Sequence, residues 1–169
     1  MQVEFSGGVC IPDFQKHVEK YKALLEWQMK KIDLSCDWID NSQTQISRHP
    51  IQGAIHQCQL GENIGNEQGE HRPVLIVSNN TMNSTSGNVV IVPLTKSLKT
   101  KTVNGRIVPR YPTNYFLYTN NYSFLQHDSA VLANEVRSIS KVRLGAHLGS
   151  IDQDDLEKVL ARLKRVIGL

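Results

Sequence analysis

The chain has 169 residues and a formal net charge of +3 at pH 7, and hydrophobic residues make up 40% of it. A chain of this length has room for one domain with an appendage and buries enough surface to fold without disulfides or a structural metal. Its longest apolar runs fall far short of the roughly 18 residues that a membrane helix needs, and no basic segment followed by an apolar one opens the chain. We therefore expect a soluble protein without a membrane partner, and the widely spaced Cys10, Cys36 and Cys58 favour a reducing cytoplasm.

Basic residues gather in the second part of the chain. Residues 1–50 carry a net charge of −1, and residues 51–169 carry a net charge of +4. From His71 to His127 there is no Asp or Glu, although six Lys and Arg residues are present. Such a segment suits a polyanion, because cations near phosphates release condensed counterions. An ordinary solvated surface accounts for the same composition equally well.

The first segment is predicted to be a long helix from Phe14 to about Asp40, with Pro12 and Asp13 as its start. Apolar residues recur there at intervals of four and three and form a stripe on one face, which Gln28 interrupts. The stripe consists of Phe14, Val18, Tyr21, Leu25 and Ile32, and Trp27, Leu34, Trp38 and Ile39 widen it. We expect it to pack on its own domain or on a dimer mate, with a partner protein or a cover for the functional groove as alternatives. Residues 41–50 are polar and predict a linker, so residues 1–50 form a helical extension and linker before a domain of residues 51–169.

From Gln52 the pattern becomes that of strands and stays so for about eighty residues. The expected strands are residues 54–60, 73–78, 88–94, 113–118 and 129–136. Turn residues fill 79–87, and a long loop at 95–112 contains Asn104–Gly105, which favours a tight hairpin. Residues 141–147 are expected to form a short helix, and Asp152 caps a final amphipathic helix. Short antiparallel strands followed by a helix indicate an α+β fold, a small and partly closed antiparallel β-barrel with a C-terminal helix.

Most common catalytic motifs are missing from the sequence. It has no GxxxxGK phosphate loop, no GxSxG elbow, no HExxH and no CxxC, and its six histidines are scattered singly, so we expect no metal. One segment stands out at residues 65–79, where a loop of hydrogen-bonding residues leads into an apolar strand with Arg72 at the junction. Chemistry is therefore expected at this junction.

Five motifs, in this order, resemble those of the MazF/PemK/Kid toxins. They are NEQGEHRPVLIVSNN (66–80), VVIVPLT (89–95), YPTN (111–114), DSAVLANEVRSI (128–139) and LGAHLGSI (144–151). The resemblance covers residues 53–169 and implies an SH3-like barrel of the CcdB/PemK type that forms a homodimer. It also implies a metal-independent endoribonuclease, without cofactors, that cuts single-stranded RNA such as mRNA at short sequences. Such a toxin leaves a 2′,3′-cyclic phosphate and a 5′-hydroxyl and is neutralised by a cognate antitoxin.

The same resemblance assigns the catalytic roles to Arg72 and Thr95 and substrate handling to Glu67 and Gln68. When a ribose 2′-hydroxyl attacks its own phosphate, the phosphorane gains negative charge, so a fixed guanidinium stabilises the transition state. A threonine hydroxyl of ordinary acidity is a poor general base, and Thr95 is expected to hold the phosphate or relay a proton. The identity of the general base stays open.

Several positions depart from the family pattern. One branch of the family uses an aspartate base and an arginine where this chain has Asn134 and Leu132, so that mechanism is not transferred. Glu135 stands where glutamine is usual, and it is a base, a reader of a cytosine amino group, or an exposed charge. The basic loop 96–110 is longer than in most relatives, and we expect its lysines to grip RNA phosphates. Those lysines are Lys96, Lys99 and Lys101.

A non-catalytic function stays open beside the nuclease. The same fold resembles CcdB, a gyrase poison that binds its target through the end of its C-terminal helix, although its pattern lacks the RP and PLT motifs that this chain has at residues 72–73 and 93–95. A catalytically silent relative is a further alternative, because aromatics usual in the first strand are replaced here by residues such as His56 and Gln57. Loss of RNA cleavage in Arg72→Ala would separate the nuclease from both.

Overall fold

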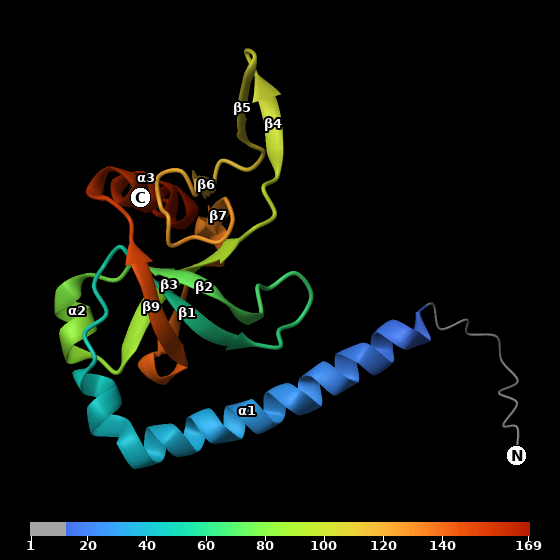
Figure 1. Ribbon diagram of the computed structural model, residues 1–169, viewed down its shortest axis with the longest axis vertical. Coiled ribbons are helices and arrows are strands. Elements are labelled where there is room, and N and C mark those ends of the chain that lie inside the picture. The colour runs from blue at the N-terminus through green and yellow to red at the C-terminus, as the bar shows by residue number, and fades with distance from the viewer. Residues whose placement is uncertain (1–12) are drawn as a thin grey trace, which may run out of the picture.

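Residues 13–169 are described in the computed structural model, and their main body is a seven-stranded antiparallel sheet with a helix packed on it (Figure 1). The strands follow the order β6-β7-β3-β2-β1-β9, and β8 pairs with β3 on the same edge as β7. They are β1 (Ala54–Gly61), β2 (Glu70–Ile76), β3 (Asn88–Thr95), β6 (Asn114–Leu117), β7 (Ser129–Leu132), β8 (Arg137–Ser140) and β9 (Leu144–Ser150). Among the described strands, β6 and β9 at the two ends do not pair with each other, so the barrel is open there. The predicted α+β fold is confirmed.

The core lies between the sheet and the C-terminal helix α3 (Gln153–Ile167). Leu75 and Val92 from the sheet and Leu156 and Val159 from α3 belong to one cluster and are at most 5% exposed. Alternate strand residues point to the opposite face and form a second buried cluster there. That cluster includes Cys58, Val74, Ile76, Ile91, Ile139 and Leu144. Because both faces of the central strands are buried, β2 and β3 appear in the sequence as continuous apolar runs.

Helix α3 begins as predicted and is tied to the sheet by a buried carboxylate. The side chain of Asp152 caps the helix by accepting a hydrogen bond from the N–H of Asp155 at 2.8 Å. The Asp155 carboxylate in turn accepts hydrogen bonds from the hydroxyls of Tyr115 (2.5 Å) and Tyr122 (2.9 Å). Burial by itself disfavours the charged form, but these bonds and one from Lys158 outweigh it and lower the pKa of Asp155 below its usual value.

The predicted N-terminal helix is present as α1 (Phe14–Ser47), and it continues past its expected end. It has a kink at Asn41, where the backbone leaves helical values, and the helix then resumes as far as Ser47. Most of the expected linker is therefore helical. The reason is tertiary, because the buried ammonium of Lys141 donates to the carbonyl of Ile46 at 2.8 Å and fixes this last turn. Asp13 precedes the helix, as expected, whereas Pro12 lies outside the described residues.

The apolar stripe of α1 does not pack on its own domain. No residue of α1 is buried, and members of the stripe such as Tyr21 (65% exposed) and Leu25 (69% exposed) face away from the sheet. Trp27 and Trp38, which were expected to widen the stripe, lie instead on the opposite face of α1, where their rings contact Gly61 and Gly87 of the domain. Packing of the stripe on a dimer mate or on another protein stays a prediction.

The hairpin predicted at Asn104–Gly105 is confirmed. Strands β4 (Thr100–Val103) and β5 (Arg106–Pro109) pair with each other in a separate two-stranded sheet that projects from the domain (Figure 1). Asn104 and Gly105 have φ values of +50° and +73°, as the two central residues of a type I′ turn require. The long loop predicted for residues 95–112 thus contains a two-stranded arm.

Three further local predictions were wrong. The strand expected at 129–136 ends at Leu132, and a 3₁₀ turn, Ala133–Glu135, separates it from β8. A short helix, α2 (Asn80–Thr85), replaces the turn expected at 79–87, because the side chain of Asn79 caps it by accepting from the N–H of Met82 at 2.8 Å. The helix expected at 141–147 is limited to a single 3₁₀ turn, Lys141–Arg143, which leads into strand β9. Strand β9 is stabilised by pairing with β1, which lies about ninety residues earlier in the chain. The sequence around residues 141–147 alone does not indicate that pairing.

Candidate nuclease site

Arg72 and Thr95 lie on the neighbouring antiparallel strands β2 and β3. The register pairs Val74 with Pro93 and Leu75 with Val92. Beyond this pairing Arg72 remains paired with Cys58 of β1, and Thr95 pairs with Ala130 of β7. Both side chains line one cleft, so the two predicted catalytic residues come together at this end of the sheet.

Clefts on both sides of Thr95 bring together most of the residues that the sequence singled out. One cleft, of about 510 Å³, is lined by Arg72, Thr95 and Lys96, and the other, of about 500 Å³, is lined by Thr95 together with Gln68, Lys99 and Glu135. A third hollow of about 340 Å³ contains Glu67 and shares Arg72 with the first cleft and Gln68 with the second. Lys101 is the exception, since it lies on β4 of the projecting hairpin and lines none of these clefts.

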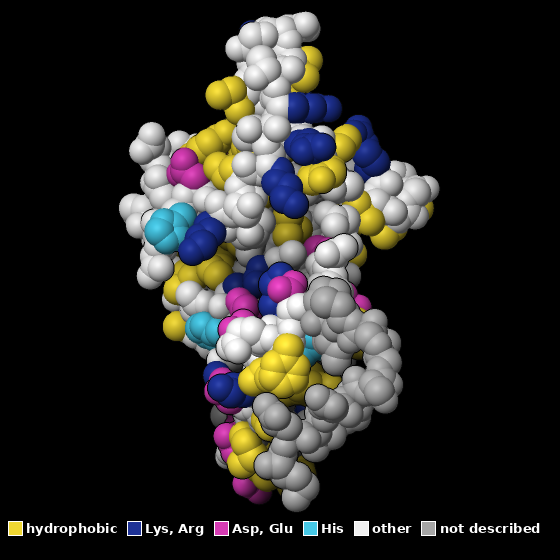
Figure 2. All heavy atoms as spheres, turned by 90° about the vertical axis from the view of Figure 1, so that its right-hand side faces the viewer, with side chains coloured by type: hydrophobic (Ala, Val, Ile, Leu, Met, Phe, Trp, Pro, Cys, Tyr) yellow, Lys and Arg dark blue, Asp and Glu magenta, His cyan; other side chains and the backbone are white. Residues whose placement is uncertain are grey.

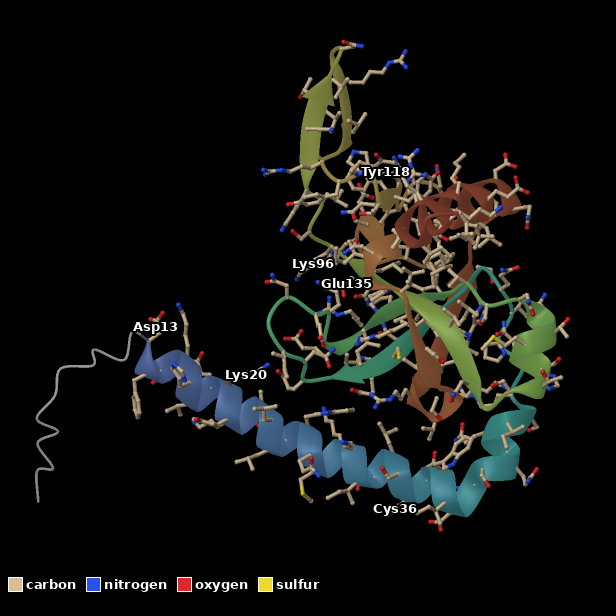
Figure 3. The ribbon with its side chains drawn as sticks, turned by 180° about the vertical axis from the view of Figure 1, so that it is seen from behind. Asp13, Lys20, Cys36, Lys96, Tyr118 and Glu135 are labelled. Carbon is tan, nitrogen blue, oxygen red and sulfur yellow. The ribbon has the colours of Figure 1, made fainter. Side chains whose placement is uncertain are left out.

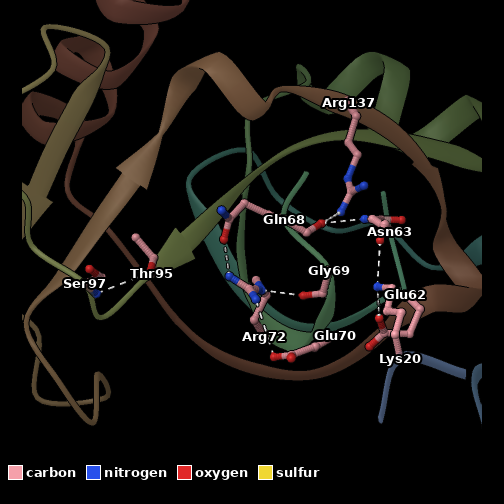
Figure 4. A network of polar contacts seen from close by, with 10 residues as sticks. All are labelled: Lys20, Glu62, Asn63, Gln68, Gly69, Glu70, Arg72, Thr95, Ser97 and Arg137. Atoms are coloured by element: carbon pink, nitrogen blue, oxygen red, sulfur yellow. Dashed lines mark hydrogen bonds and ion pairs between the residues drawn. The ribbon is translucent and has the colours of Figure 1, made fainter. Parts of the chain in front are cut away.

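The guanidinium of Arg72 is held by the end of the loop that precedes β2 (Figure 4). Its Nε donates to the carbonyl of Gly69 at 2.6 Å, and one terminal nitrogen donates to the side-chain oxygen of Gln68. The other terminal nitrogen lies 3.6 Å from the carboxylate of Glu70, whose side chain is 74% exposed. Part of the five guanidinium N–H donors therefore remains for a bound phosphate, and Glu70 is free to turn away when an anion arrives.

Thr95 ends β3 and lies between the two larger clefts. Its hydroxyl oxygen accepts a hydrogen bond from the backbone N–H of Ser97 at 3.2 Å, which fixes the side chain (Figure 4). Among the described residues this hydroxyl donates no hydrogen bond, so its proton can turn toward a ligand. The arrangement suits a hydrogen-bond donor to phosphate better than a base.

A second arginine, Arg137, holds the same loop at the backbone of Gln68. The side chain of Arg137 on β8 donates to the backbone carbonyl of Gln68 at 2.6 Å, and Asn63 donates to the same carbonyl at 2.6 Å. Burial lowers the pKa of Arg137 below its usual value, although a guanidinium remains charged in proteins. Arg137 was not singled out as a site residue in the sequence, and only the folded chain places it beneath Gln68.

Two histidines that seemed isolated in the sequence also line the cleft of Arg72. They are His71, next to Arg72 on β2, and His127, in the segment that leads to β7. Histidine side chains can donate and accept protons near neutral pH, which neither arginine nor threonine does. The only signal in the sequence was their position, since His71 lies within the motif 66–80 and His127 directly precedes the motif 128–139. Among residues 13–169, no group of three or more His, Cys, Asp or Glu could hold a metal ion.

Basic and aromatic side chains border the second cleft. Nζ of Lys99 and Cζ of Arg110 each lie 5.9 Å from the centre of the Tyr111 ring. Lys99 precedes the hairpin in the chain, and Arg110 follows it. Figure 2 looks at the side of the molecule that has the hairpin at the top, where dark-blue Lys and Arg side chains occupy the upper half and most acidic ones lie lower. The upper part of this face is thus suited to a polyanion.

The family described as PemK-like, MazF-like toxin of type II toxin-antitoxin system matches residues 51–167. The chain belongs to this family. Endoribonuclease EndoA of Bacillus subtilis (strain 168) is 27% identical to it over 117 residues, which are 69% of this chain and 93% of that protein. The residues of α1 before position 51 lie outside the family match.

Solved structures agree with the family assignment. A mycobacterial endoribonuclease in complex with its cognate antitoxin is 26% identical, with a TM-score of 0.53 over 71% of this chain and 96% of that one. MazF from Deinococcus radiodurans shares the fold at 24% identity, with a TM-score of 0.57 over 72% of this chain and 99% of that one. The family prediction is confirmed. The named relatives include endoribonucleases, one of them solved with its cognate antitoxin, so they agree with the predicted endoribonuclease toxin and not with the gyrase poison. Within residues 13–169 no helix is both long and apolar enough to cross a membrane.

Proposed function

We propose that this chain is an endoribonuclease toxin that cuts single-stranded RNA at a short sequence without a metal and is neutralised by a cognate antitoxin. The observation that carries the proposal is that Arg72 and Thr95 line one cleft, which shares Thr95 with the second cleft and Arg72 with the third hollow. The named relatives support it, since they are endoribonucleases and one is solved with its antitoxin. We place the toxin in the cytoplasm, where mRNA is available, and expect it to act as a homodimer.

In the proposed reaction the ribose 2′-hydroxyl attacks the adjacent phosphorus and the 5′-oxygen leaves. The products are a 2′,3′-cyclic phosphate and a 5′-hydroxyl. Arg72 faces the non-bridging oxygens and stabilises the negative charge that grows on them in the transition state. Its partners Gln68 and Gly69 hold the fork of N–H donors in one orientation, so little reorganisation is needed during the reaction.

Proton transfer requires a group other than Arg72. Thr95 keeps its proton in this mechanism. Its hydroxyl, which already accepts a hydrogen bond from Ser97, donates a hydrogen bond to a phosphate oxygen. His71 and His127 line the same cleft and are the imidazoles able to take the 2′-proton or supply one to the leaving oxygen.

Recognition of the RNA falls to the second cleft and the basic arm. Glu135 and Gln68 line that cleft and offer acceptors to base edges, while Glu67 lies in the adjoining hollow. Lys96 and Lys99 reach the clefts, and Lys101 on the hairpin extends the basic surface beyond them. Neutralising Lys99 and Lys101 together with Arg106 should weaken RNA binding and reduce its salt dependence. Unchanged affinity and an unchanged salt slope would remove the arm from the RNA-binding surface.

The test is to incubate the full-length protein with a long RNA of known sequence in the presence of a chelator and to map the fragment ends. We expect cuts at one recurring short sequence, with a cyclic phosphate and a 5′-hydroxyl, that Arg72→Ala slows by about 10²- to 10³-fold. Lys22→Ala removes an exposed cation on α1 that lines none of these clefts, and this variant should cleave normally. Intact RNA together with arrested growth of cells that express the protein would instead direct attention to gyrase or another protein target.

A further inference from the structure

Helix α1 touches the domain at the loop that carries the partners of Arg72. This loop, residues 61–69, joins β1 to β2. At its first residue the ring of Trp27 lies so close to Gly61 that an added Cβ would stand 2.3 Å from it. About two turns earlier on α1, Lys20 donates to the carboxylate of Glu62 at 2.5 Å and to the carbonyl of Asn63 at 2.9 Å. Figure 3 shows the Lys20 side chain on the face of α1 that is turned toward this loop.

The loop continues these contacts to the catalytic arginine (Figure 4). The side-chain amide of Asn63 donates to the backbone carbonyl of Gln68 at 2.6 Å. The side-chain oxygen of Gln68 accepts from Arg72, and the carbonyl of the next residue, Gly69, accepts from Arg72 Nε. Three hydrogen-bonded steps therefore link Lys20 to the guanidinium, through Asn63 and Gln68.

The middle of the loop has little to hold it in place by itself. Ile64 at its tip is 85% exposed, and a Cβ added to Gly65 would meet nothing within 4 Å. Its two ends are anchored by different parts of the molecule, the first by α1 and the second by Arg137. Lys20 and Arg72 also line the same hollow of about 340 Å³. A displacement of residues 62 and 63 by α1 is therefore passed on to Gln68, because few contacts in the middle of the loop oppose it.

We propose that Lys20 is a positioning residue for Arg72, so that the N-terminal extension forms part of the catalytic apparatus. Its ammonium group fixes residues 62 and 63, these fix Gln68, and Gln68 sets the orientation of the guanidinium. The consequence for cleavage rests on the proposed function of Arg72. Lys20 itself touches no reacting atom in this arrangement.

The test compares the charge reversal Lys20→Glu with the matched reversal Lys22→Glu in the full-length chain. Lys22 lies on the same helix, is exposed, and makes no hydrogen bond or ion pair with any described residue. The first measurement is the position of the Arg72 Nε–H signal in a proton–nitrogen NMR spectrum without RNA, assigned by its loss in Arg72→Ala. We expect Lys20→Glu to shift this signal and Lys22→Glu to leave it in place.

Two further variants guard against a trivial effect of the reversal. In Lys20→Glu/Glu62→Lys the ion pair is rebuilt with opposite polarity, whereas the donor to the Asn63 carbonyl is not restored, so the Arg72 signal should return part of the way to its original position. Glu62→Gln, which removes only the partner charge, should shift the signal in the same direction as Lys20→Glu. A signal unmoved by Lys20→Glu, or moved equally by Lys22→Glu, would overturn the proposal.

The second measurement is RNA cleavage at saturating substrate. Exposed ion pairs contribute modestly, so Lys20→Ala should lower kcat about two- to fivefold with KM unchanged, and the double reversal should recover part of this loss. A rise in KM with kcat unchanged would mean that Lys20 contacts RNA directly and would overturn the positioning role. Failure of the proposed function is seen separately, as no cleavage by the wild type or full cleavage by Arg72→Ala, because the NMR signal reports the link without any activity.

Discussion

The two long helices of this protein are attached to the sheet in opposite ways. Helix α3 buries Leu156 and Val159 completely or nearly so, has a side-chain cap at its start and contributes Asp155 to a buried hydrogen-bond network. Helix α1 is more than twice as long, buries no residue, and has no side-chain cap. It is held by two tryptophan rings and by a few polar contacts at its ends.

This difference teaches that helix length and apolar content do not measure a helix's share in the core. Stability of the domain should depend on α3, because apolar area removed from water dominates the folding free energy. The contacts of α1 are few, and those of Lys20 and Trp27 lie at the loop beside Arg72, so α1 should affect the site more than the stability.

The largest effect is expected when a leucine side chain on each of the two helices is shortened to alanine. Leu156→Ala should lower the free energy of unfolding by about 2–5 kcal/mol, because it opens a cavity in the core. Leu25→Ala on α1 should change it by no more than about 0.5 kcal/mol, because that side chain is 69% exposed. Urea unfolding measures both. A large loss in Leu25→Ala would show that another molecule covers the stripe, and the comparison between the helices would no longer hold.

The carboxylate that ties α3 to the sheet should give the next largest effect. Asp155→Asn replaces a charged acceptor of the Tyr115 and Tyr122 hydroxyls and should cost about 1.5–3 kcal/mol at pH 7. Because the pKa of Asp155 is lowered on folding, its contribution is fully present above the unfolded pKa of about 4 and is lost as the pH falls through the folded value. Chemical unfolding at several pH values should therefore show the difference between wild type and variant shrinking below about pH 4. A difference that does not depend on pH would show that the charge of Asp155 is not what ties α3.

A smaller effect is expected where α1 meets the sheet at Gly61. This glycine has a φ of +85°, and Gly65 in the same loop has a φ of +61°, so alanine at either position costs about 1–2 kcal/mol of backbone strain. Gly61→Ala should cost more than Gly65→Ala, because only the first displaces the Trp27 ring. Fluorescence of Trp27, measured in a Trp38→Phe background, should change in Gly61→Ala alone. Equal responses of the two variants would show that α1 does not rest on the loop in solution.

The smallest effect is the dependence on salt concentration of the free energy that contacts of α1 and of α3 contribute to folding. The Lys20–Glu62 pair is partly exposed, so its contribution should stay below about 1 kcal/mol and decline as salt rises from 0.05 to about 1 M. The measurement is the difference in unfolding free energy between wild type and Lys20→Ala at each salt concentration. Leu156→Ala should show no such decline, since its loss comes from buried apolar area. A salt-independent effect of Lys20→Ala would assign its role to packing of the side-chain stem rather than to charge.

Much of the candidate site could be predicted because it lies in short, continuous motifs. Arg72 and Thr95 stand at the ends of two apolar runs, and the motifs around them carry the resemblance that the family match bears out. The parts played by His71, His127 and Arg137 could not be predicted in the same way, although His71 and Arg137 lie within motifs, because a motif does not show which distant residues its side chains meet after folding. His127 and Arg137 reach the site only through strand pairing and loop packing between segments more than fifty residues from Arg72 in the sequence.

The sequence by itself determined the elements whose cause is local. The apolar spacing and Asp152 define α3, the 4-3 spacing defines α1, and Asn104–Gly105 defines the hairpin. The tertiary structure alone decided that β9 pairs with β1 and that the stripe of α1 faces outward. It also set Lys20 beside a loop some forty residues further along the chain. The physical reason is the same in each case, since these features depend on which distant surfaces meet, and no short window of sequence contains both partners.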